Sequence, residues 1–167
     1  MQMLEPPDSH YLSGAMGWLE LGNPTEAKLE LTRINPVYRE HPNVLEANWL
    51  ICAAERDWVA ALETARSLIQ SDPDRSFGWL HQAYALRRVP EGGLQAAWDA
   101  LLPVVERFPA EPTIPYNLSC YACQMGQVEE ARKWLRLAWS RGNKATIKAM
   151  ALGDSDLKAL WPEVKDW

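Results

Sequence analysis

Apolar side chains recur every three to four residues along most of the chain, which is the spacing of one face of an α-helix. The segment EEARKWLRLAW at 129–139 is a clear example. No stretch shows the sustained two-residue alternation, bounded by hairpin turns, that would indicate β-strands. The pattern therefore predicts an all-α protein. Prolines punctuate the periodic segments, as expected where helices begin or end, at Pro36, Pro42, Pro73, Pro90, Pro109 and Pro112.

The spacing of these prolines indicates an internal repeat. Pro42 and Pro73 are 31 residues apart, and Pro73 and Pro109 are 36 residues apart. Each interval holds two helical segments. A short turn between two helices makes them antiparallel neighbours. The sequence therefore predicts successive antiparallel helix pairs.

The clearest pair is predicted at 114–125 and 128–140. Gly126 follows the first segment and Gly142 follows the second. Glycine readily adopts the left-handed conformation that ends many helices. The two glycines therefore support both predicted helix ends.

Small residues come into register when the intervals are laid over one another. In the second helices they are Ala27, Ala61, Ala97 and Ala131, and in the first helices Ala15, Ala83 and Ser119. A small residue lets a partner helix approach closely, and large apolar residues three and four places away fill the remaining space. Together with the aromatic residues Tyr11 and Trp79, this pattern resembles the tetratricopeptide repeat, a helix-turn-helix unit of about 34 residues.

The resemblance covers residues 8–143 and implies a tetratricopeptide-like α-solenoid, a right-handed superhelix of antiparallel helix pairs forming a single domain over 1–167. The implied repeats are 8–41, 42–74, 75–110 and 111–143, followed by a helical C-terminal cap at 144–167. The fourth repeat and the tail are also similar to bacterial tetratricopeptide proteins of unassigned role.

Three segments depart from the repeat pattern. The second repeat is about three residues short in its first helix, which leaves its register open. Extra residues occur in the turn VPEGG at 89–93 and in the linker at 37–42. The tail is expected to cap the last repeat, because a solenoid must cover the apolar face at its end. The alternative is that the tail lies in a binding groove of its own or of a neighbouring chain.

In this family the first helix of each repeat lines a concave groove. The resemblance therefore implies a peptide-binding groove, and packing between helices is the alternative for each of its residues. The implied groove residues are Leu12, Met16, Trp49, Phe77, Leu80, Tyr84, Arg87, Arg88, Tyr116, Cys120 and Gln124.

The C-x-x-C pair Cys120 and Cys123 is the strongest candidate for chemistry. A redox pair places its first thiol at a helix N-terminus, but these cysteines lie past the middle of a predicted helix. A structural zinc site needs further ligands at suitable spacing, and Cys52 and the histidines are scattered. We therefore expect two small packed residues, no catalytic site, no metal and no cofactor.

The net charge of −5 is unevenly distributed, with −6 on residues 1–83 and +1 on residues 84–167. A basic cluster comprises Arg132, Lys133, Arg136, Arg141, Lys144 and Lys148. Nucleic-acid binding is one interpretation. We favour a solvated helix face with cations near helix C-termini, because the acidic chain as a whole repels phosphate.

These observations favour a non-catalytic scaffold or adaptor that docks an extended or helical apolar protein segment in the groove. The nine tryptophans fit either packed helix interfaces or an aromatic binding surface. The alternatives are a secretion-type tetratricopeptide chaperone, a self-associating protein such as a homodimer and, less favoured, a cysteine-dependent metal or redox protein. We expect a cytoplasmic location and no membrane partner, because the N-terminal MQMLEPPDSH has no signal-peptide features and no apolar run could span a bilayer.

Overall fold

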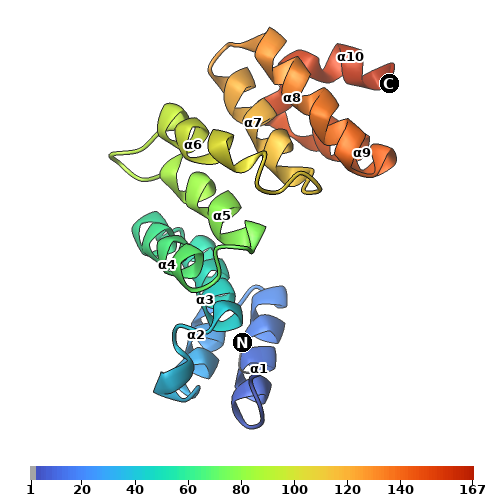
Figure 1. Ribbon diagram of the computed structural model, residues 1–167. Coiled ribbons are helices and arrows are strands. Elements are labelled where there is room, and N and C mark those ends of the chain that lie inside the picture. Colours follow the sequence, from blue (N-terminus) through green and yellow to red (C-terminus); the bar gives the residue numbers. More distant parts are fainter. Residues whose placement is uncertain (1–2) are drawn as a thin grey trace. The chain divides into compact units, whose positions relative to one another are not determined.

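The structure is a computed structural model that describes residues 3–167, and every regular element in that range is an α-helix or a 3-10 helix (Figure 1). The all-α prediction is confirmed. The chain divides into two compact units, unit 1 ending at Ala85 and unit 2 running from Leu86 to Trp167. Within the described residues, no helix combines the length and apolar character needed to cross a bilayer.

Unit 1 consists of two antiparallel helix pairs and most of a further helix. Its elements are α1 (Asp8–Glu20), α2 (Pro24–Thr32), the 3-10 helix η1 (Pro36–Tyr38), α3 (Pro42–Ala54), α4 (Trp58–Ser71) and α5 (Ser76–Leu86). Helix α1 packs along α2, α3 packs along α4, and α3 also contacts both helices of the first pair. Ala15 of α1, Ala27 of α2 and Ile51 of α3 meet in the core, where no part of them is exposed.

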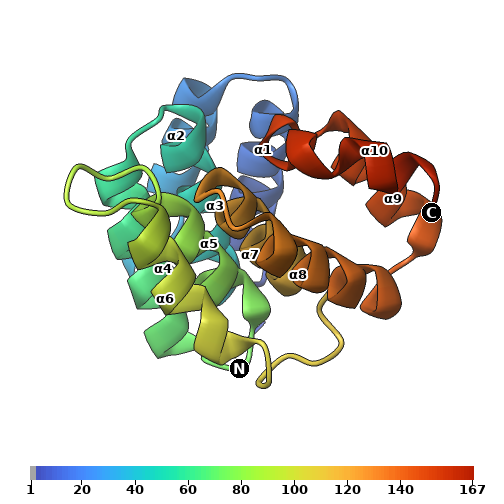
Figure 2. The ribbon, with the colours of Figure 1, turned by 90° about the horizontal axis from the view of Figure 1, so that it is seen from above.

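Unit 2 is built around the antiparallel pair α7 and α8, which lie side by side in Figures 1 and 2. Its elements are α6 (Leu94–Leu101), η2 (Leu102–Val104), α7 (Thr113–Gln124), α8 (Val128–Arg141), α9 (Lys144–Gly153), η3 (Ser155–Leu160) and α10 (Trp161–Lys165). The observed α7 and α8 end within one residue of the predicted boundaries. Helix α6 contacts α7, α9 contacts α8, and η3 contacts α7 and α8.

The turns within three helix pairs have the same geometry. A residue with left-handed backbone stands at each turn, with φ of 73° at Gly22, 59° at Arg56 and 78° at Gly126. In each case the next N–H donates to a carbonyl five residues back, as in a Schellman turn. Gly22 and Arg56 are 34 residues apart, and Arg56 and Gly126 are 70 residues apart. The backbone therefore repeats with a period of about 35 residues at these points.

This turn also fixes the register of the second pair, which the sequence left open. Ala15 and Ser119 lie seven residues before their turns, and Trp49 occupies the same place before Arg56. A large aromatic residue thus stands where the other first helices carry a small one. The arginine at position 56 makes this turn hard to recognise in the sequence, because glycine is the usual residue in this conformation.

The four aligned alanines of the second helices, Ala27, Ala61, Ala97 and Ala131, are fully buried. In unit 2 the buried Ser119 hydroxyl donates a hydrogen bond of 2.7 Å to the carbonyl oxygen of Ala131. This contact requires the backbones of α7 and α8 to approach closely, so the predicted role of small residues at helix contacts is confirmed for this pair.

Candidate functional site

The first helix of unit 1 presents part of the predicted groove to solvent. Leu12 and Met16 lie one helical turn apart on α1 and therefore share a face. Leu12 is half-buried, and Met16 is 37% exposed. Both side chains are accessible to a partner.

An aromatic cluster joins α3 and α5 within unit 1. The ring of Trp49 contacts those of Phe77, His81 and Tyr84 at centroid distances of 6.0, 4.1 and 5.9 Å. Trp49 is only 4% exposed, so it lies in the core, whereas Tyr84 is 37% exposed. Tyr84 also contacts Trp58 of α4, at 5.9 Å. The cluster has a buried tryptophan at its centre and an accessible tyrosine at its edge.

The other two predicted groove residues of α5, Phe77 and Leu80, are half-buried. Phe77 stacks on His81 with ring centroids 3.6 Å apart. Part of the Phe77 ring therefore packs within unit 1. The Leu80 side chain remains partly accessible.

His81 is held neutral inside the aromatic cluster. Burial lowers the pKa of its imidazole to about 4, although Nδ1 donates a hydrogen bond of 2.8 Å to the Phe77 carbonyl. The residue is half-buried, and its ring packs against those of Trp49 and Phe77. The structure identifies it as a packed, uncharged ring.

This pKa predicts an acid-sensitive step in stability. The unfolded imidazole takes up a proton below about pH 6.5, whereas the folded one resists it down to about pH 4. The contribution of the neutral His81 ring to the free energy of unfolding is therefore fully present above pH 6.5. It is lost as the pH falls from about 6.5 to about 4. When the pH is lowered from 7 to 4.5, the free energy of unfolding should fall by about 2 kcal/mol less for His81→Phe than for the natural chain. Urea unfolding at both pH values would measure this difference.

A matched control for this experiment is His10→Gln, because His10 is exposed. It should retain the pH slope of the natural chain. Identical slopes for all three proteins would contradict the assignment of His81 as a neutral, half-buried ring.

In unit 2 the predicted groove face of α7 is covered by the chain's own C-terminal segment (residues 154–167). The hydroxyl of Tyr116 donates to Asp154 at 3.1 Å, and the thiol of Cys120 lies 3.5 Å from the same carboxylate oxygen. The side-chain amide of Gln124 donates to the carbonyl oxygen of Asp156 at 3.3 Å. Tyr116 and Cys120 are consequently buried, while Gln124 remains exposed.

Arg87 completes this polar cluster from the residue directly after α5. Its guanidinium forms an ion pair of 2.5 Å with Asp156 and lies over the Tyr121 ring, 5.7 Å from the centroid. The neighbouring Arg88 is half-buried. The structure thus brings Arg87, Tyr116, Cys120 and Gln124 together around one acidic segment.

Sequence reasoning missed the two carboxylates at the centre of this cluster. Asp154 is the N-cap of η3, because its side chain accepts from the N–H of Asp156 at 3.0 Å. The signal for a further role was the D-S-D spacing, which places two acidic side chains at the start of a segment otherwise rich in apolar residues.

Apolar side chains anchor the C-terminal segment beneath these polar contacts. Leu157, Leu160 and Val164 are almost completely buried. The indole N–H of Trp161 donates to the carbonyl oxygens of Ala151 and Asp154 at 2.8 and 3.2 Å. The segment therefore covers the last helix pair and lies along the α7 face at the same time.

The cluster also contains the set of side chains best placed for chemistry. Ligand atoms of Cys120, Asp154 and Asp156 lie within 4.8 Å of one another, close enough for one cation to contact all three. However, burial and the nearby Asp154 raise the pKa of the Cys120 thiol far above its ordinary value. Arg87 already neutralises Asp156. The arrangement favours a protonated thiol that donates a hydrogen bond over a nucleophile or a metal ligand.

This assignment predicts a clear order of thiol reactivity. Cys123 is half-buried, whereas Cys120 is buried and close to carboxylates. At pH 8 the Cys120 thiol should react with a disulfide reagent about a hundredfold more slowly than Cys123. Rates measured on Cys52→Ser/Cys123→Ser and Cys52→Ser/Cys120→Ser would reveal each thiol alone. Equal rates would indicate an activated Cys120.

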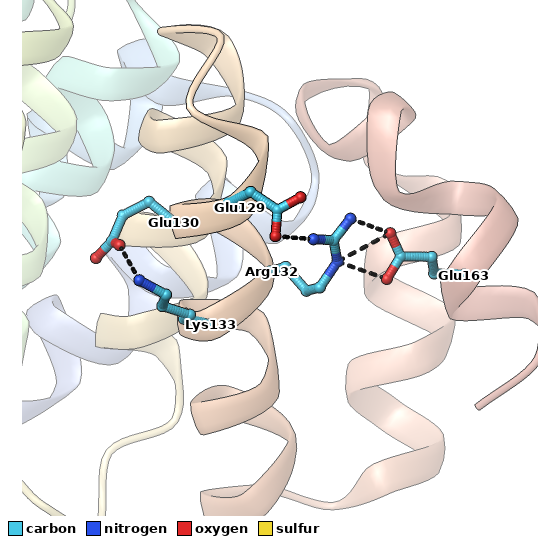
Figure 3. A network of polar contacts seen from close by, with 5 residues as sticks. All are labelled: Glu129, Glu130, Arg132, Lys133 and Glu163. Atoms are coloured by element: carbon cyan, nitrogen blue, oxygen red, sulfur yellow. Dashed lines mark hydrogen bonds and ion pairs between the residues drawn. The ribbon is translucent and has the colours of Figure 1, made fainter.

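Two members of the basic cluster, both on α8, form ion pairs within unit 2 (Figure 3). Arg132 pairs with Glu163 of α10 at 2.5 Å and also with Glu129, and Lys133 pairs with Glu130 at 3.1 Å. The hydrogen bond from Arg132 also lowers the pKa of Glu163. These pairs weaken the nucleic-acid interpretation of the cluster.

Two further members of the cluster donate to backbone oxygens. Lys148 contacts the carbonyls of Lys165 and Trp167 at 2.8 and 2.9 Å, and Arg141 lies 3.5 Å from that of Val105. Four of the six cations thus serve internal contacts.

A comparison of the chain with protein-family models finds no match, and neither does a comparison with curated proteins. The interpretation of its function therefore depends on its residues and their geometry.

Proposed function

We propose that the protein is a non-catalytic, tetratricopeptide-like binding module that holds a peptide or protein segment along the first helices of its pairs. The repeated left-handed turn at Gly22, Arg56 and Gly126 supports this relationship. So do the buried alanines aligned in the second helices.

The main observation in support of the proposal is the packing of η3 across α7. Tyr116 and Cys120 hold the side chain of Asp154, and Gln124 holds the backbone of Asp156. These three residues lie at four-residue intervals, so one face of a first helix provides these three contacts. The same chain thus contains an example of a polypeptide segment recognised in the proposed way.

In unit 1 the corresponding face is the proposed site for a foreign segment. Leu12 and Met16 on α1, and Leu80 and Tyr84 on α5, offer accessible apolar and aromatic surface. Residues 1–83 also carry twice as many acidic as basic side chains, 12 against 6. An apolar segment flanked by basic residues is therefore the partner that this unit would attract most strongly.

The proposal can be tested with displayed random peptides selected for binding to the natural chain. The double variant Met16→Ser/Tyr84→Ser should no longer bind most of the selected peptides, because it removes apolar contact area from the proposed face. The matched control is Leu29→Ser/Val59→Ser, which removes exposed apolar side chains from the second helices α2 and α4. Binding that survives the first change or is lost equally with the second would contradict the proposal.

A further inference from the structure

A pocket of about 530 Å³ lies at the C-terminal end of α8 in unit 2, away from the α7 face. Its lining consists of Arg136 and Trp139 of α8, Lys144 at the start of α9, and Trp167. Its volume falls in the range typical of small-molecule sites, roughly 300–1,000 Å³. The chemistry of these four side chains indicates what it could bind.

Two tryptophans form the apolar part of the pocket. The rings of Trp139 and Trp167 meet edge to face, with centroids 4.9 Å apart and planes at 80°. Both residues are only half-buried, so aromatic surface remains accessible. A flat ring could contact this surface in a stacked or edge-on arrangement.

The charged side chains that line the pocket are Arg136 and Lys144. Arg136 and Lys144 are exposed, and neither makes an ion pair or hydrogen bond with any residue in the range 3–167. They are the two members of the basic cluster without such a contact, although the charge of Arg136 helps to lower the pKa of Glu163. None of the four lining side chains is acidic.

The acidic side chain that interacts electrostatically with Arg136 already has an ion-pair partner. Glu163 of α10 is held by Arg132 (Figure 3). Arg136 and Lys144 are exposed beside the two tryptophan rings, and neither forms an ion pair within the described residues. Such a combination favours a ligand that brings both a ring and a negative charge.

We infer that this pocket binds a small aromatic anion, a flat ring carrying a carboxylate, phosphate or sulfonate. The ring packs against Trp139 and Trp167, and the acidic group pairs with Arg136 and Lys144. This site is independent of the peptide-binding face proposed above, so failure of either proposal leaves the other intact.

The test is calorimetric titration of the full chain with adenosine monophosphate and indole-3-acetate. Adenosine and indole provide the rings alone, and inorganic phosphate and acetate provide the anions alone. At least one aromatic anion should bind about tenfold more tightly than both of its parts. If neither does, the inference is overturned.

Variants then locate the site. Arg136→Gln and Trp167→Leu should each weaken binding about tenfold. Lys133→Gln is the matched control, because Lys133 lies on the same helix but pairs with Glu130, and it should bind as the natural chain does. The indole N–H resonances of Trp139 and Trp167 should shift on titration. Binding that Arg136→Gln and Trp167→Leu leave unchanged would overturn the inference, even if the chain binds the probes elsewhere.

Discussion

Replacing Leu157 by alanine should destabilise unit 2 by about 2–5 kcal/mol, the usual cost of removing a fully buried leucine side chain. Leu157 has no exposed surface and belongs to η3, which packs on α7 and α8. Its truncation would leave a cavity beneath the polar contacts of Asp154 and Asp156. Urea unfolding followed by circular dichroism would measure the change.

The control is Lys158→Ala, the adjacent and exposed residue of η3. It should alter stability by no more than about 0.5 kcal/mol. If Leu157→Ala costs as little as the control, the C-terminal segment is only loosely attached. The α7 face with Tyr116 and Cys120 would then be open to exchange with a partner segment.

Trp49→Ala should destabilise unit 1 by about 3–5 kcal/mol, because it removes the central ring of the aromatic cluster. Phe77, His81 and Tyr84 would each lose their contact with that ring. Chemical unfolding monitored by far-ultraviolet circular dichroism would give the difference.

Trp49→Phe is the informative companion variant. The Trp49 indole N–H is buried without a hydrogen-bond partner. Phenylalanine would lose ring volume but remove this unsatisfied donor, so the net cost should stay below about 1.5 kcal/mol. Equal losses for Ala and Phe would show that the N–H makes a contact that stabilises the fold.

The parts of the fold that depend on local sequence could be predicted. Helical periodicity and the glycine at position 126 gave the limits of α7 and α8 within one residue. The alanine spacing identified helix contacts, since only a small side chain allows close approach.

The register of the second helix pair could be assigned only from the structure. Arg56 adopts the left-handed conformation that glycine adopts at the equivalent turns, with φ of 59°. Trp49 stands at a position that is small in the other first helices, so no local pattern marked it as a packing residue. Its burial depends on rings that α5 supplies from more than 25 residues away.

The surroundings of the predicted groove residues could not be predicted from periodicity either. Helical spacing identifies which residues share a face but not what covers that face. The ion pair between Arg87 and Asp156 joins residues 69 positions apart. The contact between Tyr116 and Asp154 spans 38 positions. The C-terminal segment therefore covers the α7 part of the predicted groove, while Met16 and Tyr84 in unit 1 remain exposed.

The central claim, that a partner segment binds to the first helices of unit 1, is tested most directly by nuclear magnetic resonance. A selected peptide would be titrated into the isotope-labelled chain, and the shifted resonances would be assigned. The proposal predicts shifts that centre on Leu12, Met16, Leu80 and Tyr84. Shifts centred on Leu29 and Val59, on the second helices, would contradict it.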